Sequence, residues 1–566
     1  MQNAEIAKYL AEIADMMELT GENFFHVRAY RNAARAILDY PGNFSKLTLK
    51  QMEEVPDIGK SISSKLDTLI KTGELALHQE LRKKVPPGMM DVMKLPALGP
   101  KRVKQLHDEL GIKSLDDLKN AIESGAIRTI RGFGPKMEES LRQALARRSQ
   151  VVTKRWLYAD AAIEVEKLLN HLRGCAAVAK IEVAGSFRRK RESVGDLDLL
   201  AISNDPAQVM TRLVEYPRVA QTLGIGDTKT TVVLHDGLQV DLRVLPEESY
   251  GAALIYFTGS KDHCVHIRRI AQRMELSLNE YGLFRGKESV AGRTEEEVYR
   301  ALGLEWIAPE LREDRGEIKA AMDHTLPHLI AREDLRGDLH SHSTYTDGRA
   351  SIEEMARAAD QAGLEYLAIT DHSQRLAMVN GLDPKRLREQ WREIEEVQSR
   401  VKVKLLRGIE VDILEDGALD LPDHVLAELD WVVASVHYKL HQPHNEMTRR
   451  LVTAIKNPNV DVIGHPSGRL LIDEREPSSF DFNELMRAAA SEGCALEVNS
   501  QSQRLDLTDT NCIAAKHAGV KLVISSDSHS TTGFGLLQFG VNQARRGWIE
   551  PGDVLNTRPL KDLRQR

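Results

Sequence analysis

The sequence has little cysteine. Four residues of this type occur in 566, and Cys175, Cys264, Cys494 and Cys512 are scattered without a CxxC pair. A disulfide framework needs cysteines in a regular, closely spaced pattern, so this class of protein is disfavoured. The pattern fits the reduced thiols of a cytoplasmic protein.

Long hydrophobic runs are also missing. No apolar stretch approaches the roughly 20 residues that a helix needs to span a bilayer. The start, Met1–Ala7, is acidic and helical in character and does not have the layout of a signal peptide. We therefore expect a cytoplasmic protein with no membrane partner.

Neither sign of charge is in large excess. The net charge is −7, but residues 1–150 hold 24 Lys and Arg against 20 Asp and Glu. This distribution permits nucleic-acid binding by the N-terminal part without arguing for it. A chain of 566 residues, 42% of them hydrophobic, is long enough for about three to five domains.

Helical periodicity dominates the first 80 residues. Ile6, Leu10, Ile13 and Met17 form one apolar stripe, and Phe24–Tyr40 forms a second. The Pro-Gly pair that follows ends this second helix. The N-terminal region is therefore expected to be all-α.

A short motif occurs three times in residues 1–150: an apolar residue, a turn with glycine, and a helix start with lysine. The copies are Val55–Ile62, Leu95–Val103 and Ile130–Met137; Asp57 and Ala97 replace the first glycine in the first two. Backbone N–H groups at such a helix start hold a phosphate without reading a base. One copy alone would indicate a glycine-capped helical hairpin, whereas three copies predict helix–hairpin–helix elements that grip a sugar–phosphate backbone. The residues that we expect at DNA are Gly59, Gly99, Lys101, Gly132, Gly134 and Lys136.

The most informative stretch is Ala184–Leu200, whose pattern predicts a strand end, a Gly-Ser turn with basic residues and a second strand. Side chains alternate along a strand, so Asp196 and Asp198 should share one face. A later strand, Leu238–Leu245, contributes Asp241. Three acids that face one point repel each other unless cations lie between them, and they suit two Mg²⁺ ions shared with substrate phosphates. Such ions activate an attacking hydroxyl and stabilise a leaving pyrophosphate.

The turn of this stretch has the chemistry of a triphosphate site. Gly185 lets the backbone approach closely, and Ser186, Arg188 and Arg189 can donate hydrogen bonds to phosphate oxygens. Together with the later motif Tyr256–Ser260 (Tyr-Phe-Thr-Gly-Ser), the pattern resembles the nucleotidyltransferase superfamily that includes DNA polymerase beta. Within it, the sequence is most similar to the bacterial family X DNA polymerases.

This resemblance implies roles for individual residues. Asp196 and Asp198 would bind both ions, and Asp241 the ion that lowers the pKa of the primer 3′-hydroxyl. The implied nucleotide-binding residues are Gly185, Ser186, Arg189, Tyr256, Phe257, Gly259 and Arg268, the last of which contacts the template minor groove in the family. Cys264 departs from the family, because it replaces an asparagine commonly aimed at the incoming base. A thiol is a weak donor, so insertion efficiency or fidelity is expected to differ.

Residues 1–80 also resemble the 5′-deoxyribose-phosphate lyase domain of polymerase beta. Lys65 falls where the Schiff-base lysine of that family lies, and Tyr30 matches a residue beside it. The supporting lysines are absent, since His26 and Ser61 occupy their positions. An ordinary solvated lysine is at least as good an interpretation, so lyase activity stays open.

From Asp338 onward, short apolar strands alternate with helical segments such as Ile352–Ala362 and Leu485–Ser491. We count seven strands, Gly337–His340, Tyr366–Thr370, Val403–Gly408, Trp431–Val436, Val460–Gly464, Ala495–Asn499 and Lys521–Ser525. This alternation predicts a parallel sheet, and seven repeats predict a barrel closed by seven strands.

Side chains that bind metals follow these strands at corresponding ends. They are His340, His342, Asp347, His372, Glu410, His437, His465, Asp527 and His529. Active sites of α/β barrels lie at the C-terminal strand ends, so these ligands should converge. Imidazole with carboxylate suits Zn²⁺, Mn²⁺ or Fe²⁺ rather than Ca²⁺, and the set is large enough for up to three ions, with Glu410 as a bridging candidate.

The set resembles the polymerase and histidinol phosphatase (PHP) domain, all of whose ligand types are present. The resemblance implies Mn²⁺- or Zn²⁺-dependent phosphoesterase chemistry, in which water attacks a phosphodiester. The expected activity is a 3′-5′ exonuclease, with abasic-site endonuclease or 3′-phosphatase activity as further options. Candidates for substrate contact are Asp371, Lys439, Arg469, Asn499 and Arg504.

We therefore predict a multidomain fold with an all-α helix–hairpin–helix region, an α+β nucleotidyltransferase palm with a thumb, and an α/β seven-stranded barrel. The expected boundaries are a lyase-like helical domain at 1–82, a fingers-like helix–hairpin–helix domain at 83–150, the palm at 151–250, a thumb-like domain at 251–312, a linker at 313–335 and the PHP domain at 336–566.

The predicted function is that of a cytoplasmic DNA repair enzyme, associated with the nucleoid during repair, that fills short gaps and has a 3′-5′ exonuclease. Its expected partners are gapped or nicked DNA and dNTPs, and we expect a monomer. One alternative is a small-molecule phosphatase of the histidinol-phosphatase type with a degenerate palm. The other is a non-catalytic DNA scaffold. The intact palm acids argue against the first, and the complete ligand set argues against the second.

Overall fold

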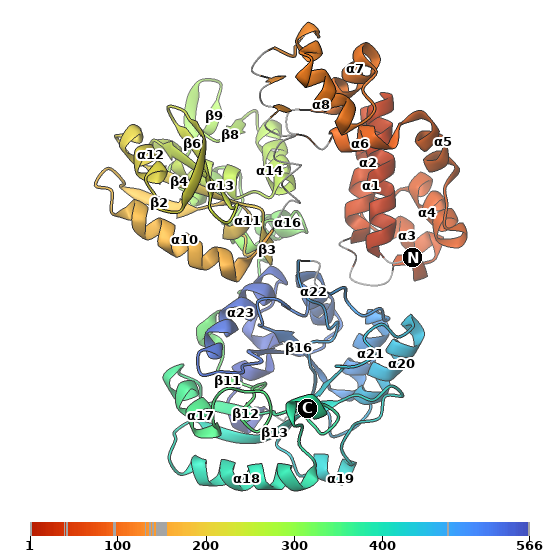
Figure 1. Ribbon diagram of the computed structural model, residues 1–566, viewed down its shortest axis with the longest axis vertical. Helices are drawn as coiled ribbons and strands as arrows, with labels where there is room; N and C mark the ends of the chain where they lie inside the picture. The colour runs from red at the N-terminus through yellow and green to blue at the C-terminus, as the bar shows by residue number, and fades with distance from the viewer. Residues whose placement is uncertain are drawn as a thin grey trace. The chain divides into compact units, whose positions relative to one another are not determined.

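The computed structural model describes residues 3–38, 40, 44–93, 95, 98–130, 132–134, 137–138, 141–142, 155–472 and 475–563. The chain divides into two compact units, residues 1–154 and 155–566 (Figure 1). The first unit holds the motifs expected to bind DNA, and the second holds both sets of expected metal ligands.

The first unit is helical. Its helices are α1 (Asn3–Thr20), α2 (Phe24–Leu38), α3 (Leu49–Glu54), α4 (Lys60–Thr72), α5 (Ala76–Lys84), α6 (Pro87–Met93), α7 (Pro100–Leu110) and α8 (Leu115–Glu123). The predicted stripe of Ile6, Leu10, Ile13 and Met17 is buried in one apolar cluster that continues through these helices. The prediction of an all-α N-terminal region is confirmed.

The palm is built on a five-stranded sheet with the order β2-β4-β7-β6-β5. Its elements are β1 (Trp156–Leu157), α10 (Tyr158–Arg173), β2 (Lys180–Val183), α11 (Gly185–Arg188), β3 (Ser193–Val194), β4 (Asp196–Ile202), α12 (Pro206–Val214), β5 (Val219–Ile225), β6 (Lys229–Leu234) and β7 (Gln239–Leu245). Leu197, Leu199, Val240 and Leu242 pack in one core with residues of α10 and α12. Because strand side chains alternate, these helices leave the opposite face of β4 and β7 to the carboxylates.

The thumb-like part begins with the helix pair α13 (Tyr250–Thr258) and α14 (Lys261–Arg273). It continues with the antiparallel strands β8 (Ser277–Asn279), β9 (Gly282–Arg285) and β10 (Glu288–Ala291), then α15 (Glu295–Ala301) and α16 (Glu317–Met322). Helix α16 lies in the segment that we expected to be a linker. Its Ile318 and Ala321 are buried in the same core as Ile307 and Leu311, so this part of the segment packs as the end of the thumb-like part.

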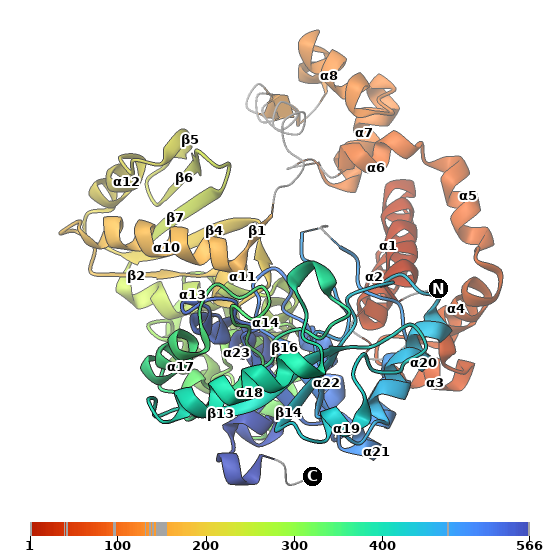
Figure 2. The same ribbon diagram turned by 60° about the horizontal axis from the view of Figure 1, so that its bottom comes forward.

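The C-terminal part contains seven parallel strands in sequential order (Figures 1 and 2). They are β11 (Gly337–Asp338), β12 (Tyr366–Ile369), β13 (Lys404–Asp412), β14 (Trp431–Ser435), β15 (Val462–Ile463), β16 (Ala495–Asn499) and β17 (Leu522–Ser525). A parallel bridge between Ser341 and Ser528 joins the first strand to the last, just beyond their ends. The predicted seven-stranded barrel is confirmed.

Helices cover the outside of this barrel: α17 (Ile352–Gln361), α18 (Pro384–Gln398), α19 (Asp423–Leu426), α20 (His444–Ile455), α21 (Phe482–Glu492), α22 (Asp509–His517) and α23 (Leu537–Arg546). A separate apolar cluster that includes Leu339, Ala368, Val433 and Val523 comes from the alternate strand positions and fills the interior. The barrel is thus a packed core, and polar chemistry is confined to its rim.

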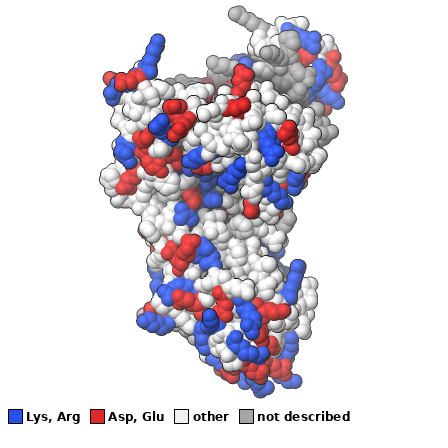
Figure 3. Space-filling model, turned by 90° about the vertical axis from the view of Figure 1, so that its left-hand side faces the viewer, with Lys and Arg blue, Asp and Glu red and all other residues white. Residues whose placement is uncertain are grey.

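Within the described ranges, no helix combines the length and the apolar character that crossing a membrane requires. On the face shown in Figure 3, basic and acidic side chains are interspersed. This agrees with the small net charge of the sequence, which does not by itself indicate the type of binding partner.

Candidate active sites

The palm carboxylates lie side by side because β4 and β7 pair in parallel. The register places Asp198 directly opposite Asp241, and Asp196 lies two residues earlier on the same face of β4. Burial, with the charges of Asp196 and Asp241, raises the pKa of Asp198 to about 7. Burial and Asp241 also raise the pKa of Asp196. Such mutual repulsion is the electrostatic signature of a site that a cation completes.

Neighbouring side chains hold two of these acids in place. Asp241 accepts hydrogen bonds from the Lys229 ammonium, 3.1 Å away, and from the Thr231 hydroxyl. Gly185 has a φ of +63°, and a Cβ at this position would lie 2.5 Å from Asp198 Oδ2. Glycine is therefore needed at position 185 for two reasons: the backbone conformation and the room for the Asp198 carboxylate.

Replacing Asp198 by asparagine should raise the unfolding temperature of the metal-free palm, and more at pH 8 than at pH 5.5. The pKa of Asp198 is about 7 in the folded protein and about 3.9 in an unfolded chain. A raised folded-state pKa means that ionisation destabilises the fold, and this penalty grows as pH rises from about 4 to about 7. Calorimetry in EDTA at both pH values measures it, with the exposed palm residue Asp227 replaced by asparagine as the control. An equal shift at both pH values would contradict the assigned repulsion.

The turn after β2 forms the short helix α11, and its two arginines have different partners. Arg188 makes a bidentate ion pair with Glu295, at 2.6 and 2.9 Å, and Arg312 also binds this carboxylate. Arg188 therefore joins the palm to the thumb-like part, and the expectation that it binds phosphate does not fit its geometry. Arg189 donates to the Thr258 carbonyl and, at 3.1 Å, to Glu313. Ser186 is partly exposed.

The motif Tyr256–Ser260, expected to bind the nucleotide, lies at the end of α13 beside this turn. Tyr256 is 36% exposed, and the Arg268 guanidinium lies 5.0 Å from its ring centre. Arg243 lies 4.5 Å from the ring centre of Phe257. A Cβ on Gly259 would lie 3.0 Å from the Arg189 guanidinium, so glycine allows the motif and the turn to approach each other. The structure thus brings the expected nucleotide-binding residues to one side of the palm.

Cys264 does not face open space. Its side chain is buried, and its thiol donates to the Ile255 carbonyl at 3.4 Å. Burial raises the pKa of this thiol, so it stays protonated at neutral pH. An asparagine here would have to turn away from this backbone contact to reach a base.

Five of the other eight expected barrel ligands lie around Glu410, which is 1% exposed. Its Oε2 lies 2.9 Å from His372 Nδ1 and 3.3 Å from His340 Nε2. Its Oε1 lies 3.0 Å from His465 Nε2 and 3.2 Å from His437 Nε2. Burial alone would raise the pKa of Glu410, but the facing imidazoles of His437 and His340 hold it well below its usual range. A carboxylate whose two oxygens face different imidazoles has the geometry of a bridge.

Three overlapping groups of these side chains could each hold a metal ion, because their ligand atoms lie within 4.8 Å of one another. The groups are His342, Asp347, His372 and His529; His340, His342 and Asp527; and His372, Glu410 and His437. Among the described residues, buried nitrogens of His340, His342 and His372 have no hydrogen-bond partner. Burial, with His529 and His372 nearby, lowers the pKa of His342 to about 3, so this imidazole is neutral, as a metal ligand must be. The donor set therefore fits divalent metal ions.

The sequence did not reveal the carboxylates that orient these ligands. Glu497 lies 2.7 Å from His340 Nδ1, and Asp412 lies 3.1 Å from His437 Nδ1. Such contacts fix the tautomer and leave Nε2 for a metal. One signal was present: Glu497 is a charged residue inside the apolar strand β16, where it is 1% exposed.

Three of the five residues proposed as substrate contacts are engaged within the protein. Asp371 accepts hydrogen bonds from Ser343 and Gln390. Asn499 donates to Asp527 at 3.0 Å, and Arg469 makes an ion pair with Glu192 of the palm. Of the other two, Lys439 is exposed and Arg504 is partly exposed.

In the first unit, glycines begin the helices of the repeated motif. Gly59 and Gly99 precede α4 and α7 with φ of −85° and −77°. A Cβ added at Gly59, Gly99, Gly132 or Gly134 would meet nothing within 4 Å. The fold itself therefore does not require glycine at Gly59 and Gly99, and the missing side chain leaves room for something outside the chain. Lys136 and the Lys101 side chain lie outside the described residues.

Lys65 lies on α4, and its ammonium donates to the Tyr30 hydroxyl at 2.6 Å. The structure thus brings together the two residues expected for a lyase site, although a hydrogen bond of this kind also occurs where lysine has only a structural role.

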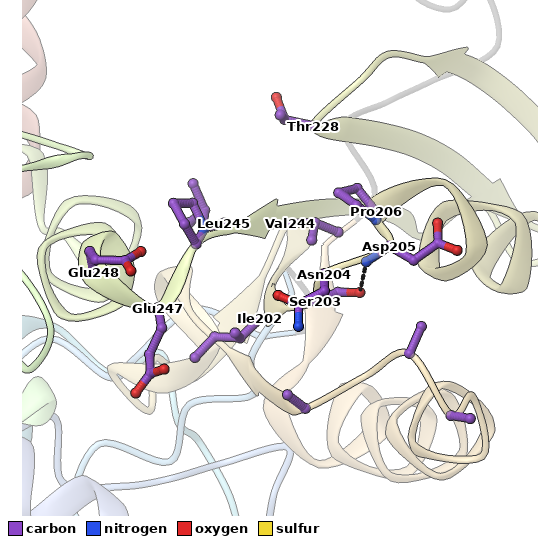
Figure 4. A pocket seen from close by; sticks show the side chains of 14 residues that line it. Ile202, Ser203, Asn204, Asp205, Pro206, Thr228, Val244, Leu245, Glu247 and Glu248 are labelled. Atoms are coloured by element: carbon purple, nitrogen blue, oxygen red, sulfur yellow. Dashed lines mark hydrogen bonds between the residues drawn. The ribbon is translucent and has the colours of Figure 1, made fainter.

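A pocket of about 650 Å³ lies at the end of the palm sheet opposite the three carboxylates (Figure 4). It is lined by Ile202 and Leu245, at the ends of β4 and β7, and by Asp205, whose N–H donates to the Ser203 hydroxyl. Asp196 begins β4, so the pocket and the carboxylates lie at opposite ends of these strands. This pocket is separate from the expected nucleotide site.

Four family models match the chain. A helix-hairpin-helix domain matches residues 1–75, a SAM-like helix-hairpin-helix tandem matches 89–147, the DNA polymerase beta thumb matches 253–313, and the PHP domain matches 338–501. The matches thus cover the DNA-binding motifs, the helix pair beside the palm and most of the barrel.

Relatives match either the whole chain or the barrel. DNA polymerase/3′-5′ exonuclease PolX of Bacillus subtilis (strain 168) is 38% identical over 568 residues, which cover 100% of this chain and 99% of that protein. A protein of Thermoanaerobacter sp. (strain X514) named as a probable phosphatase is 31% identical over 39% of this chain and 89% of its own. Another of that name, from Acetivibrio thermocellus, is 33% identical over 34% of this chain and 78% of its own.

Proposed function

This chain belongs to the PolX family of DNA polymerases with a 3′-5′ exonuclease, and from that premise we propose that it is a repair polymerase that fills short gaps and trims 3′ ends. The match to a PolX protein over the full length of both chains carries this proposal. It binds DNA and uses divalent metal ions in both catalytic parts. In finer detail, the partners are gapped or nicked DNA and dNTPs, and the enzyme acts as a monomer in the cytoplasm, at the nucleoid during repair.

The division of labour follows the domains. Residues 1–150 grip the DNA backbone through the open helix starts at Gly59, Gly99 and Gly134, with Gly132, Lys101 and Lys136 beside them. Residues 151–250 and 251–312 carry nucleotidyl transfer, and residues 336–566 carry hydrolysis. The open space at the glycines supports close approach of a phosphate, because a side chain would otherwise fill it.

The polymerase site uses Asp196, Asp198 and Asp241 as ligands of two Mg²⁺ ions. When bound, these ions supply activation of the primer 3′-hydroxyl and charge neutralisation of the leaving pyrophosphate. The carboxylates, whose positions the strand register fixes, orient the site. Lys229 and Thr231, on the neighbouring strand β6, donate to the two oxygens of Asp241 and fix this carboxylate beside Asp198, its partner in the strand register.

The nucleotide lies between α11 and the end of α13. Ser186 and Arg189 donate to the triphosphate, and Gly185 and Gly259 keep this space clear. Tyr256 and Phe257 lie under the sugar, and Arg268 reaches the template. The contact of Arg189 with the Thr258 carbonyl supports this arrangement because it joins the motif to the turn, and the contact of Arg268 with the Tyr256 ring joins the motif to α14.

The exonuclease site uses the nine barrel ligands, with Glu410 as the bridging carboxylate, for up to three Mn²⁺ or Zn²⁺ ions. When bound, these ions supply a nucleophilic water and stabilise charge on the phosphodiester. Glu497 and Asp412 orient His340 and His437. Matches to phosphatases that cover only 34–39% of this chain support a shared hydrolytic chemistry in the barrel, and the palm and DNA-binding parts favour a polynucleotide substrate over a small molecule.

The proposal predicts opposite changes in one labelled primer on gapped DNA. With dNTPs and Mg²⁺ the primer should lengthen to the end of the gap, because the palm acids and the turn are intact. Without dNTPs and with Mn²⁺ it should shorten from its 3′ end. Gel analysis of the purified full chain measures both, and an ungapped duplex serves as the control. If the primer neither lengthens nor shortens with any metal ion, the proposal is contradicted.

A further inference from the structure

The turn that we assign to the triphosphate is held from behind by the last helix of the barrel. Arg546, at the end of α23, donates from Nη1 to the Arg189 carbonyl at 2.8 Å and to Glu313 Oε1 at 3.0 Å. Its Nη2 donates to Asp509 Oδ2 at 2.6 Å. The side chain is 1% exposed. Three acceptors from three segments thus meet at one buried guanidinium, which is planar and matches such an arrangement.

Glu313 connects this guanidinium to the side chain of the nucleotide-binding arginine. The same Oε1 that accepts from Arg546 also accepts from Arg189 Nε, at 3.1 Å. Burial would raise the pKa of Glu313, but Arg546 and Arg189 together lower it. Arg191 Nη1 lies 3.8 Å from the same oxygen, so three cations share this one carboxylate.

Glu192, three residues after Arg189, makes a second contact between the palm and the barrel. Glu192 accepts from Gln543 Nε2 at 2.7 Å and forms an ion pair with Arg469. Glu192 precedes Asp196 by four residues. The barrel therefore contacts the basic turn at Arg189 and the chain again at Glu192, shortly before the strand of catalytic carboxylates.

We propose that Arg546, a residue of the barrel, is a positioning residue for nucleotide incorporation by the palm. It fixes the backbone of Arg189 and takes part of the Glu313 charge, so that the Arg189 guanidinium remains available to a triphosphate. Without Arg546, Glu313 keeps only Arg189, at 3.1 Å, and the more distant Arg191, at 3.8 Å, so it binds Arg189 more strongly and competes with the phosphates. This inference rests on the proposed function, because it takes residues 185–189 as the triphosphate site.

The test is the dNTP dependence of single-nucleotide incorporation by full-length Arg546→Gln. We expect KM for dNTP to rise about tenfold, because small displacements of a binding group have effects of this size. The value of kcat should change less than about twofold, since a contact made equally in ground and transition states affects KM alone. Degradation of single-stranded DNA with Mn²⁺ should also change less than about twofold. Arg546→Lys, which keeps the charge, should have a KM for dNTP between those of the wild type and Arg546→Gln.

Arg545→Gln is the matched control. Arg545 is the preceding residue of α23 and donates to Glu310 at 2.8 Å and to the Ile330 carbonyl at 3.0 Å. It stabilises the same junction without touching the turn, so KM for dNTP should stay within about twofold of the wild type.

Each outcome decides the inference. An unchanged KM in folded Arg546→Gln overturns it, as does an equal rise in Arg545→Gln or a parallel loss of both activities and thermal stability. Should Arg546→Gln fail to fold, Asp509→Ala removes one of the three acceptors of Arg546; a KM at least about threefold higher supports the inference and an unchanged KM overturns it. Wild-type protein that incorporates no nucleotide refutes the proposed function instead, which separates the two failures.

Discussion

Replacing Asp196 and Asp198 together by alanine is expected to abolish nucleotide incorporation on gapped DNA. These residues supply two of the three carboxylates on the shared face of β4 and β7. We expect a loss of at least about 10³-fold, which corresponds to about 4 kcal/mol of activation free energy. Single-nucleotide incorporation under Mg²⁺ measures it.

The same double variant should keep its 3′-5′ degradation of DNA. The exonuclease ligands lie at the rim of the barrel and come from other segments of the chain. Alanine at exposed Asp227, also in the palm, is the matched control and should leave incorporation unchanged. Normal incorporation by the double variant would refute the palm assignment, whereas loss of both activities would show that the substitutions unfold the second unit.

Replacing His340 by alanine should give the reciprocal result, with Mn²⁺-dependent 3′ degradation eliminated and gap filling retained. Its Nε2 lies 3.3 Å from Glu410, so the substitution removes a ligand at the centre of the cluster. We expect at least about 10³-fold loss of degradation. Because the change also leaves buried Glu497 without its imidazole partner, Glu410→Gln, which preserves volume, is the second variant.

Metal content gives a readout of this prediction that does not depend on activity. Elemental analysis of the purified protein should find less bound metal in His340→Ala than in the wild type, because one ligand of the cluster is gone. His517→Ala changes an exposed histidine of the same barrel and should bind as much metal as the wild type. Persistent degradation by both cluster variants would place the nuclease elsewhere or identify a contaminant.

Features with short-range periodicity could be predicted from the sequence. The strict alternation around Asp196, Asp198 and Asp241 predicts that they share a face, and the structure places Asp198 opposite Asp241. The barrel was predictable for the same reason, since six of its seven strands are apolar runs with a metal-ligand side chain at or just after the end. Parallel pairing then brings those ends together without further information.

Features that depend on distant partners could not be predicted. Arg188 follows a Gly-Ser turn as a phosphate-binding residue would, yet Glu295, more than 100 residues later, binds it. Arg469 lies beside a metal ligand in the sequence, yet its partner is Glu192 of the palm. The charged segment after residue 312 looked like a linker because its apolar positions are few, although Ile318 and Ala321 are enough to anchor it. A charged residue near a site in the sequence can therefore be assigned to the substrate only when it is known whether a residue of opposite charge elsewhere in the chain binds it.

The central claim is that carboxylates and imidazoles from distant segments bind divalent cations in two separate places. Anomalous diffraction from crystals soaked in Mn²⁺ tests it most directly. The account predicts peaks beside Asp196, Asp198 and Asp241, and further peaks around Glu410. Strong peaks around Glu410 with none at the palm carboxylates, or peaks only at surface acids, would contradict it.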